Sequence, residues 1–219
     1  MKAARLSRAT VRLVGALALP ALLAGCSSDD GAAASGTSSS APAVVSSTPA
    51  APVAQGPVGP GCALFPAEGA GSLASLTAVP VGAAVYTVPQ LSTLTQAVIA
   101  ANLVDVVNTR ADVTVFAPSD AAFAALGPEA LPALLADVPR LTTLLTHHVV
   151  SGRLTPDQLP GEHTTLNGDL ITVTGPADAP EVTADQTVPG TAAATVLCGN
   201  VPTANATVYV IDQVLTPAG

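Results

Sequence analysis

The amino-acid sequence predicts an α+β fold in one domain that begins at Gly61. Helical periodicity dominates the first half of this region, and two-residue alternation dominates the part after Gly161. Because helices come first and strands later, without regular β-α-β alternation, a doubly wound parallel sheet is not expected. A region of about 160 residues, 61–219, suits one domain with a single hydrophobic core.

The first helix is predicted over residues 91–101, in LSTLTQAVIAA. Its apolar residues recur on one helical face: Leu91, Leu94, Val98 and Ala101. A further helix is predicted in PRLTTLLTHHVV, residues 139–150, where an apolar stripe also recurs at helical spacing.

The stretch DVTVFAPSDAAFAALG predicts a strand that leads into a helix. Residues 113–117 are β-branched, aromatic or small, and Pro118 disfavours α conformation in the residue before it. Ser119 is expected to cap the helix, with Asp120 in its first turn, and Gly127 with Pro128 to end it.

After Gly161, four stretches are expected to be strands separated by Gly, Pro and Asn turns. They are LITVTG, EVTADQTV, AATVLC and ATVYVIDQVL, over residues 170–175, 181–188, 193–198 and 206–215. Glu162 and His163 are expected in a turn, and Asn205 is expected to turn the chain into the last strand, although Asn205-Ala206-Thr207 has the pattern of a glycosylation acceptor.

Residues 1–25 are predicted to be a signal peptide. Four basic residues precede an apolar run over 13–23, which is too short for a permanent span of about 30 Å. Leu23-Ala24-Gly25-Cys26 follows directly and resembles a bacterial lipobox, in which the cysteine is lipidated. The alternative is a plain secretory signal with an incidental cysteine. We expect acyl chains on Cys26 to hold the protein on the outer side of the cell membrane, in the cell envelope.

Residues 26–60 are predicted to be the lipidated cysteine and a disordered tether. The tether contains no Leu, Ile or aromatic residue, so it has little to bury against the entropy cost of ordering. It would span roughly 35 Å as a flexible coil and about 100 Å if fully extended.

Removal of the signal leaves three arginines against fifteen carboxylates, a formal net charge of −12. This argues against a nucleic-acid partner, which needs a basic surface. The one lysine, Lys2, is removed with the signal, which excludes Schiff-base chemistry. With Cys26 lipidated, Cys62 and Cys198 are expected to form one disulfide in an exported chain, the alternative being two free thiols.

Two adjacent histidines lie at the end of the predicted helix 139–150. His148 continues the stripe of Leu141, Leu144 and Leu145 and is expected to be a structural core residue. His147 projects about 100° away and is expected to be solvated, as a candidate contact surface. Neighbouring helical residues point in different directions, so no metal site is expected.

No motif of a hydrolase or a nucleotide-binding loop is present, so neither an enzyme nor a cofactor is expected. The aromatic residues are Phe65, Tyr86, Phe116, Phe123 and Tyr209. Most are expected in the core, which leaves few rigid anchors for an interface.

Several stretches together resemble the fasciclin (FAS1) domain family. TVFAPSDAAFAAL looks like its first signature box, ATVYVIDQVLTP like its second, and LLTHHVVSGRL lies where the family usually has a Tyr-His pair. GPGC, STLTQA and LCGNVPTANATVYVID are similar to mycobacterial fasciclin-type surface lipoproteins and secreted antigens. The resemblance spans about residues 85–217 and suggests an actinobacterial protein.

The resemblance implies a single fasciclin domain, a β-sheet wedge capped by helices. It also implies a Cys62–Cys198 bridge that ties the N-terminal extension to the penultimate strand. In animal members the Tyr-His stretch is associated with adhesion; here His147 replaces the tyrosine, which weakens any adhesive role carried over from it.

The function implied is a non-enzymatic, lipid-anchored interaction module for a protein, glycan or glycolipid ligand, expected to be a monomer. The alternative is a carrier or sensor of lipid or glycolipid that uses an apolar groove between helices and sheet.

Overall fold

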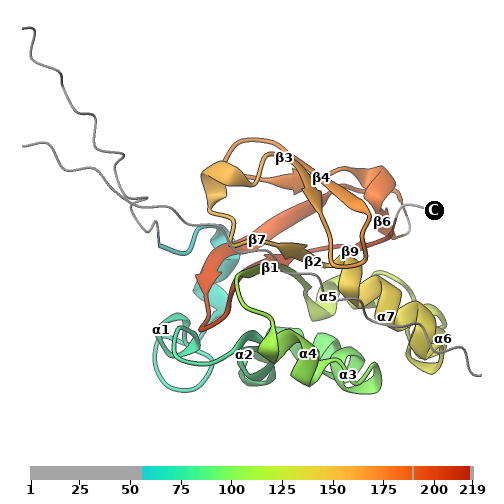
Figure 1. Ribbon diagram of the computed structural model, residues 1–219, viewed down its shortest axis with the longest axis horizontal. Coiled ribbons are helices and arrows are strands. Elements are labelled where there is room, and N and C mark those ends of the chain that lie inside the picture. The colour runs from blue at the N-terminus through green and yellow to red at the C-terminus, as the bar shows by residue number, and fades with distance from the viewer. Residues whose placement is uncertain (1–55, 189, 218–219) are drawn as a thin grey trace, which may run out of the picture. The chain divides into compact units, whose positions relative to one another are not determined.

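Seven strands form the main sheet in the computed structural model, which describes residues 56–188 and 190–217 (Figure 1). The signal peptide, the tether up to residue 55 and the lipidated Cys26 lie outside the described residues. The strand order is β2-β1-β8-β7-β5-β4-β3, and β6 pairs with β9 in a separate ribbon. The strands are β1 (Val113–Pro118), β2 (Val149–Ser151), β3 (Gly161–Thr164), β4 (Leu170–Thr174), β5 (Glu181–Val182), β6 (Thr187–Val188), β7 (Ala194–Pro202), β8 (Ala206–Ile211) and β9 (Val214–Leu215).

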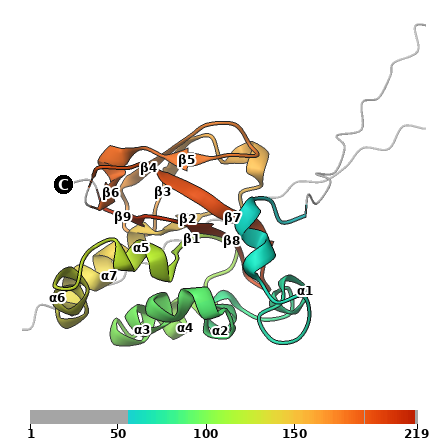
Figure 2. The ribbon, with the colours of Figure 1, turned by 180° about the vertical axis from the view of Figure 1, so that it is seen from behind.

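The helices lie on one side of the central strands β1 and β8, and the strands β3, β4 and β5 of the same sheet lie on the opposite side (Figures 1 and 2). The helices are α1 (Leu73–Leu76), α2 (Val81–Thr87), α3 (Ser92–Ala100), α4 (Val104–Thr109), α5 (Asp120–Ala124), α6 (Ala130–Ala136) and α7 (Val138–His147). Short 3-10 turns are η1 (Pro60–Leu64), η2 (Pro89–Leu91), η3 (Pro156–Gln158) and η4 (Ala184–Gln186). The predicted α+β wedge capped by helices is confirmed. No helix in the described ranges is long and apolar enough to cross a bilayer.

The centre of the sheet is the parallel pair β1 and β8, in register from Val113–Ala206 to Pro118–Ile211. All residues of both strands are buried. Val115 and Val208 face an apolar cluster on the helical side, whereas Phe116, Tyr209 and Ile211 belong to a second cluster under β4 and β5. Because successive side chains of a strand point to opposite faces of the sheet, β1 and β8 contribute residues to both apolar clusters.

Local signals correctly predicted the first strand and two helices. The predicted helix over 91–101 ends as α3, with Leu91 in η2. The helix predicted over 139–150 is α7, but Val149 and Val150 at its predicted end lie in β2 instead. Ser119 caps α5, since its Oγ accepts a hydrogen bond of 3.3 Å from the backbone N–H of Ala122.

Three predictions in the second half were wrong in detail. The stretch 181–188 is not one strand, because η4 breaks it into β5 and β6, which join different sheets. The stretch 206–215 divides into β8 and β9 at Asp212, whose carboxylate accepts hydrogen bonds of 2.7 Å from the backbone N–H and the hydroxyl of Thr195. Glu162 and His163 lie in β3, paired with β4, rather than in a turn.

Asn205 connects the turn before β8 to the helical layer. Its Oδ1 accepts a hydrogen bond of 2.8 Å from the N–H of Val81, the first residue of α2. Its Nδ2 donates to the carbonyls of Val107 and Arg110, both at 2.7 Å. The side chain thus supplies hydrogen-bond partners to a backbone N–H at the start of α2 and to backbone carbonyls at the end of α4.

A disulfide joins Cys62 in η1 to Cys198 in β7, with an S–S distance of 1.99 Å and a sequence separation of 136. This is the pairing that the family resemblance implied. A backbone bridge between Val58 and Gly199 lies beside it, with N–O distances of 3.0 and 2.7 Å. The N-terminal extension is therefore fixed against the outer side of β7.

Reduction of this disulfide should lower the free energy of unfolding by up to about 5 kcal/mol. The bond closes a loop whose ends are 136 residues apart, and it removes the corresponding entropy from the unfolded chain. Urea unfolding with and without reductant measures the loss. The double variant Cys62→Ser/Cys198→Ser serves as the control and should not respond to reductant; equal midpoints for the oxidised and reduced chains would contradict the claim.

Candidate functional site

The two histidines lie at the end of α7, where the chain passes into β2. Their rings are edge to face, with centroids 6.2 Å apart. Both are buried, with His147 0% and His148 2% exposed. Neither side chain is therefore available to a partner at the surface.

His148 joins α7 to β9. Its Nδ1 lies 2.8 Å from the carbonyl oxygen of Leu144, and its Nε2 accepts a hydrogen bond of 2.9 Å from the N–H of Leu215. These two bonds require the neutral ring with its proton on Nδ1. Burial lowers the pKa of His148 from 6.5 to about 4, against the opposing effect of the Leu144 bond. The core role predicted for His148 agrees with its burial and bonds.

His147 is not a contact surface, which corrects the sequence prediction. Its Nδ1 lies 2.8 Å from Oδ1 of Asp169, in the turn between β3 and β4. That turn covers the face of α7 on which a helical wheel would leave His147 exposed to solvent. The turn is held there by a hydrogen bond of 2.7 Å from the N–H of Leu166 to the carbonyl of Val149. The wheel describes one helix in isolation, so it could not show a cover supplied by residues 165–169.

Asp169 is the acceptor at the centre of this turn. Burial alone would raise its pKa, but hydrogen bonds from Thr165, Asn167 and His147 outweigh burial and hold the pKa of Asp169 below its usual value. Nε2 of His147 is buried and has no hydrogen-bond partner among the described residues. A hydrolytic triad would need a nucleophile at that nitrogen, so the pair does not form one.

Other polar candidates are also used by the fold. His163 has its Nε2 2.8 Å from the carbonyl oxygen of Leu159. Arg153 donates to Asp112 and to the carbonyls of Thr203, Ala204 and Ala206. Within residues 56–188 and 190–217, no group of three or more His, Cys, Asp or Glu side chains could hold a metal ion.

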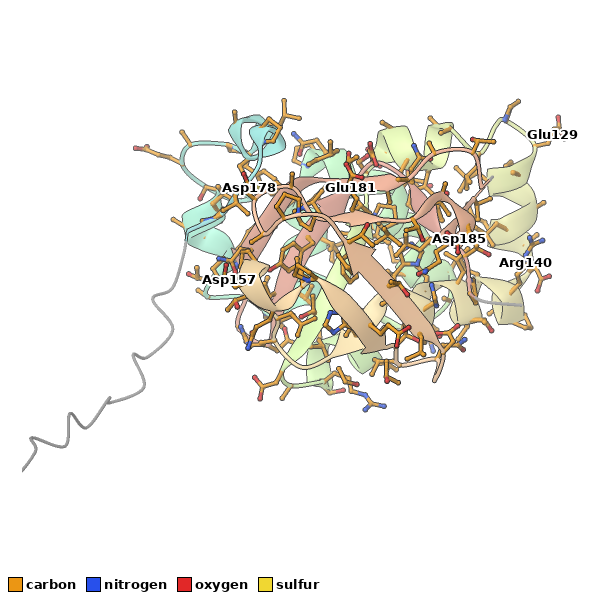
Figure 3. The ribbon with its side chains drawn as sticks, turned by 90° about the horizontal axis from the view of Figure 1, so that it is seen from above. Glu129, Arg140, Asp157, Asp178, Glu181 and Asp185 are labelled. Carbon is orange, nitrogen blue, oxygen red and sulfur yellow. A yellow bond between two sulfur atoms is a disulfide. The ribbon has the colours of Figure 1, made fainter. Side chains whose placement is uncertain are left out.

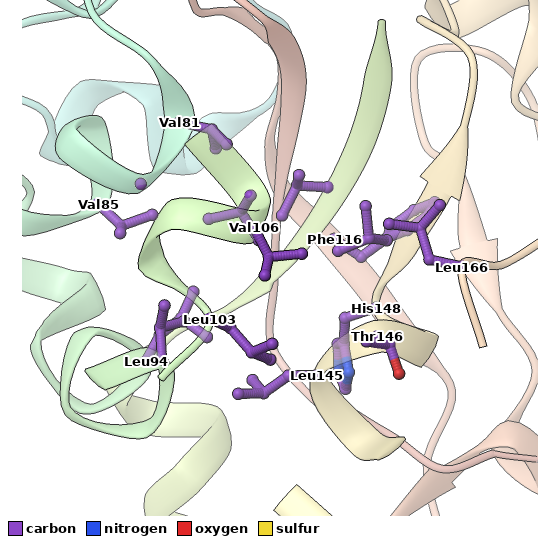
Figure 4. A pocket seen from close by; sticks show the side chains of 15 residues that line it. Val81, Val85, Leu94, Leu103, Val106, Phe116, Leu145, Thr146, His148 and Leu166 are labelled. Atoms are coloured by element: carbon purple, nitrogen blue, oxygen red, sulfur yellow. The ribbon is translucent and has the colours of Figure 1, made fainter. Parts of the chain in front are cut away.

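An apolar slot lies between α2, α3 and α4 on one side and the end of α7 on the other (Figure 4). Its lining includes Val85, Leu94, Val106 and Phe116, and its polar side chains are Thr146 and His148. Both ring nitrogens of His148 are already engaged. The cavity volume is only about 50 Å³, so the slot is narrow.

A second, larger pocket has a cavity volume of about 370 Å³ and lies where η1, η2, α5 and β7 meet. Apolar side chains form most of its wall: Leu64, Phe65, Val88, Leu91, Leu197 and Val210. Its polar lining consists of Gln90, Ser119 and Asp120, and Cys198 of the disulfide also lines it. We call this the extension pocket, because the N-terminal extension forms one wall.

Asp120 has a role that the sequence did not predict beyond the first turn of α5. Its Oδ1 accepts a hydrogen bond of 2.7 Å from the N–H of Thr93, and its Oδ2 accepts one of 2.7 Å from Oγ of Ser92. Burial would raise the pKa of Asp120, but these bonds lower it below its usual value. Asp120 therefore caps the N-terminus of α3 as a charged carboxylate. The available signal in the sequence was that Ser92 and Thr93 open a helix that has no capping side chain just before it.

The side of the molecule that carries β3, β4 and β5 is acidic. Asp157, Asp178, Glu181 and Asp185 are exposed there, and Arg140 on α7 lies toward the end of the view where Asp185 and Glu129 are labelled (Figure 3). The described part of the chain contains three arginines, and Arg153 is engaged with Asp112 and backbone carbonyls. This surface favours approach of a cationic partner.

Comparison with known proteins identifies relatives over most of the chain. A family model described as the fasciclin domain matches residues 89–217. The chain is 40% identical over 210 residues to the cell surface glycolipoprotein MPB83 of Mycobacterium bovis, covering 90% of each protein. It is 41% identical over 168 residues to the immunogenic protein MPB70 of the same species, covering 73% of this chain and 82% of the relative.

Among solved structures, the chain is similar to the FAS1 domain pair of the insect cell adhesion molecule fasciclin I. The TM-score is 0.46 at 22% sequence identity, over 57% of this chain. The match spans 45% of that chain, so it covers less than half of the solved domain pair.

His148 should make stability depend on pH. The unfolded chain takes up a proton at about the ordinary pKa of 6.5, whereas the folded ring does so only at about 4. The stability that this neutral ring provides is complete above pH 6.5 and is lost progressively as the pH falls to about 4, a total of about 3 kcal/mol. Urea unfolding at pH 7.5 and 4.5 should show a larger loss for the unmodified chain than for His148→Gln. Equal losses would mean that another group causes the dependence.

His147→Ala should lower the free energy of unfolding by about 2 kcal/mol or more. The change leaves a cavity and removes the ring partner of Asp169. Thr143→Ala, at an exposed position of the same helix, is the matched control and should stay within about 0.5 kcal/mol. Urea unfolding measures both variants. If His147→Ala lost no more free energy of unfolding than Thr143→Ala, the ring of His147 would have to be exposed to solvent, as the sequence predicted.

Proposed function

The chain belongs to the fasciclin domain family, and we propose that it is a non-enzymatic adhesion or interaction module held on the cell surface by acyl chains on Cys26. The single observation that carries this proposal is the 40% identity to a cell surface glycolipoprotein over 90% of both proteins. A shared architecture over that length includes the region before the domain as well as the domain itself.

The chemistry of the domain supports a binding role over a catalytic one. The polar side chains that sequence patterns suggest for chemistry are used to hold elements together: His147, His148 and Ser119. What remains for function is the surface and its pockets.

The proposed mechanism is presentation. Acyl chains on Cys26 hold the N-terminus in the membrane, and two or three chains anchor a protein stably where a single chain does not. Residues 27–60 then give the domain a reach of roughly 35 Å to about 100 Å from the anchor. The acidic side that carries β3, β4 and β5 and the extension pocket would contact a protein or glycan ligand at that distance from the membrane.

The second candidate function is a carrier or sensor of lipid or glycolipid. The apolar slot of Figure 4 favours it, because a carrier needs a continuous apolar cleft. The cavity volume of this slot, about 50 Å³, argues against a carrier, since ligand pockets usually enclose about 300–1,000 Å³. Organic extraction of the purified protein decides between the two: a carrier copurifies with a stoichiometric lipid beyond its own anchor.

Cys26→Ala should release the protein into the medium or leave it with its signal uncleaved. The thiol of Cys26 is the only group in the lipobox-like stretch that can accept the acyl chains. Cell fractionation followed by mass measurement of the N-terminal peptide tests this. Ser27→Ala is the neighbouring control and should remain in the membrane fraction. A mature Cys26→Ala protein that still partitions with membranes would refute the anchor.

A further inference from the structure

We propose that the extension pocket binds a lysine or arginine side chain presented by a protein partner, with the cationic head at Asp120 and the aliphatic stem against Leu64 and Phe65. The inference rests on the proposed function, since it names the chemistry by which the interaction module would recognise a protein. The residues that line the pocket, from Gly61 to Val210, are all among those that the structure describes.

The anionic end of the pocket is the carboxylate of Asp120. Its oxygens accept hydrogen bonds from the N–H of Thr93 and the hydroxyl of Ser92, which are neutral donors and leave the negative charge in place. Asp120 is the only charged residue in the lining, so no cation within the pocket neutralises it.

Gln90 adds a second polar side chain to the lining. Its Nε2 donates to the carbonyl of Leu64 at 2.7 Å, which fixes the orientation of the amide. Its Oε1 is buried and has no hydrogen-bond partner among the described residues, which is unfavourable. A turn of the amide that brought Oε1 into the pocket would let it accept a hydrogen bond from a bound donor.

The apolar wall matches the stem of a long cationic side chain. Leu64 is 62% exposed at the rim, and Phe65, Leu91 and Val210 continue the apolar surface inward. Lysine and arginine combine a chain of methylene groups with a charged head, so they can contact both parts at once. A purely apolar ligand would cover Asp120 without bringing a cation to its charge, and that charge would repel an anionic ligand.

The disulfide maintains this geometry. Cys62 lies in η1, between Gly61 and the apolar pair Leu64 and Phe65, and its bond to Cys198 holds them over β7. The excess of acidic residues on the domain attracts a basic segment over a longer range, and the pocket would then select one side chain.

The test uses the full chain, labelled with nitrogen-15 and solubilised in detergent micelles, titrated with three blocked amino acids. The probes are the N-acetyl N-methylamides of lysine and arginine, and that of norleucine is the neutral control. We expect saturable shifts of the amide signals of Leu64, Gln90 and Ala121 with at least one cationic probe, at a Kd on the order of 1–10 mM. Added salt should weaken binding, and norleucine should bind at least tenfold more weakly.

Two variants locate the binding. Asp120→Asn should weaken it at least tenfold; because Asp120 also caps α3, the thermal midpoint of this variant must be measured. Leu64→Ser should weaken binding several-fold without a loss of folding, since Leu64 is largely exposed. Leu170→Ser, at a leucine 50% exposed on β4, is the matched control and should leave binding unchanged.

The inference is overturned if neither cationic probe gives saturable shifts, if norleucine binds equally well, or if Leu64→Ser behaves like Leu170→Ser. None of these results affects the proposed function, because membrane partitioning through Cys26 is measured separately. Conversely, loss of the anchor with intact probe binding would refute the proposed anchoring and leave the pocket in place.

Discussion

The parallel pairing of β1 with β8 is the constraint on which the rest of the structure depends. Parallel neighbours cannot be joined by a tight turn, so a long connection has to link residue 118 to residue 206. All the elements from α5 to β7 lie within this connection. The two central strands are buried on both faces, and their alternate residues, such as Val115 and Phe116, face different apolar clusters. The two signature stretches of the sequence are therefore hydrogen-bonded neighbours.

Polar side chains then fix the other layers to this centre. Asn205 ties the turn before β8 to α2 and α4, and Asp120 ties α5 to α3. His147 and His148, adjacent in sequence, tie the end of α7 to two different places, the β3–β4 turn and β9. These polar groups are the ones that a search for catalytic residues selects first, and each of them is engaged in hydrogen bonds that hold the fold together.

The fold was predictable to the extent that its signals are local. The family resemblance is confirmed by the match over residues 89–217, and strand β1, the Ser119 cap and the helix α3 follow from spacing within a few residues. The break between β5 and β6 and the burial of His147 were not predictable in this way, because distant residues cause them. Gln186 accepts from the N–H of Thr172, and Asp169 reaches His147 across 22 positions. The extension pocket is likewise formed by segments far apart in the sequence, among them those that carry Cys62 and Cys198, so no periodicity could indicate it.

The hydrogen bonds of Asn205 have a consequence for making the protein. Asn205-Ala206-Thr207 is an acceptor pattern for the glycosylation enzymes of a eukaryotic secretory pathway, which act on the nascent chain before it folds. A sugar attached to Nδ2 would occupy the space where the carbonyls of Val107 and Arg110 approach to 2.7 Å. In such a chain α4 could not pack beside the start of β8. Protein secreted from yeast or mammalian cells would therefore be a mixture of unmodified molecules that fold and glycosylated molecules that do not. Bacterial production avoids this heterogeneity without any change to the sequence.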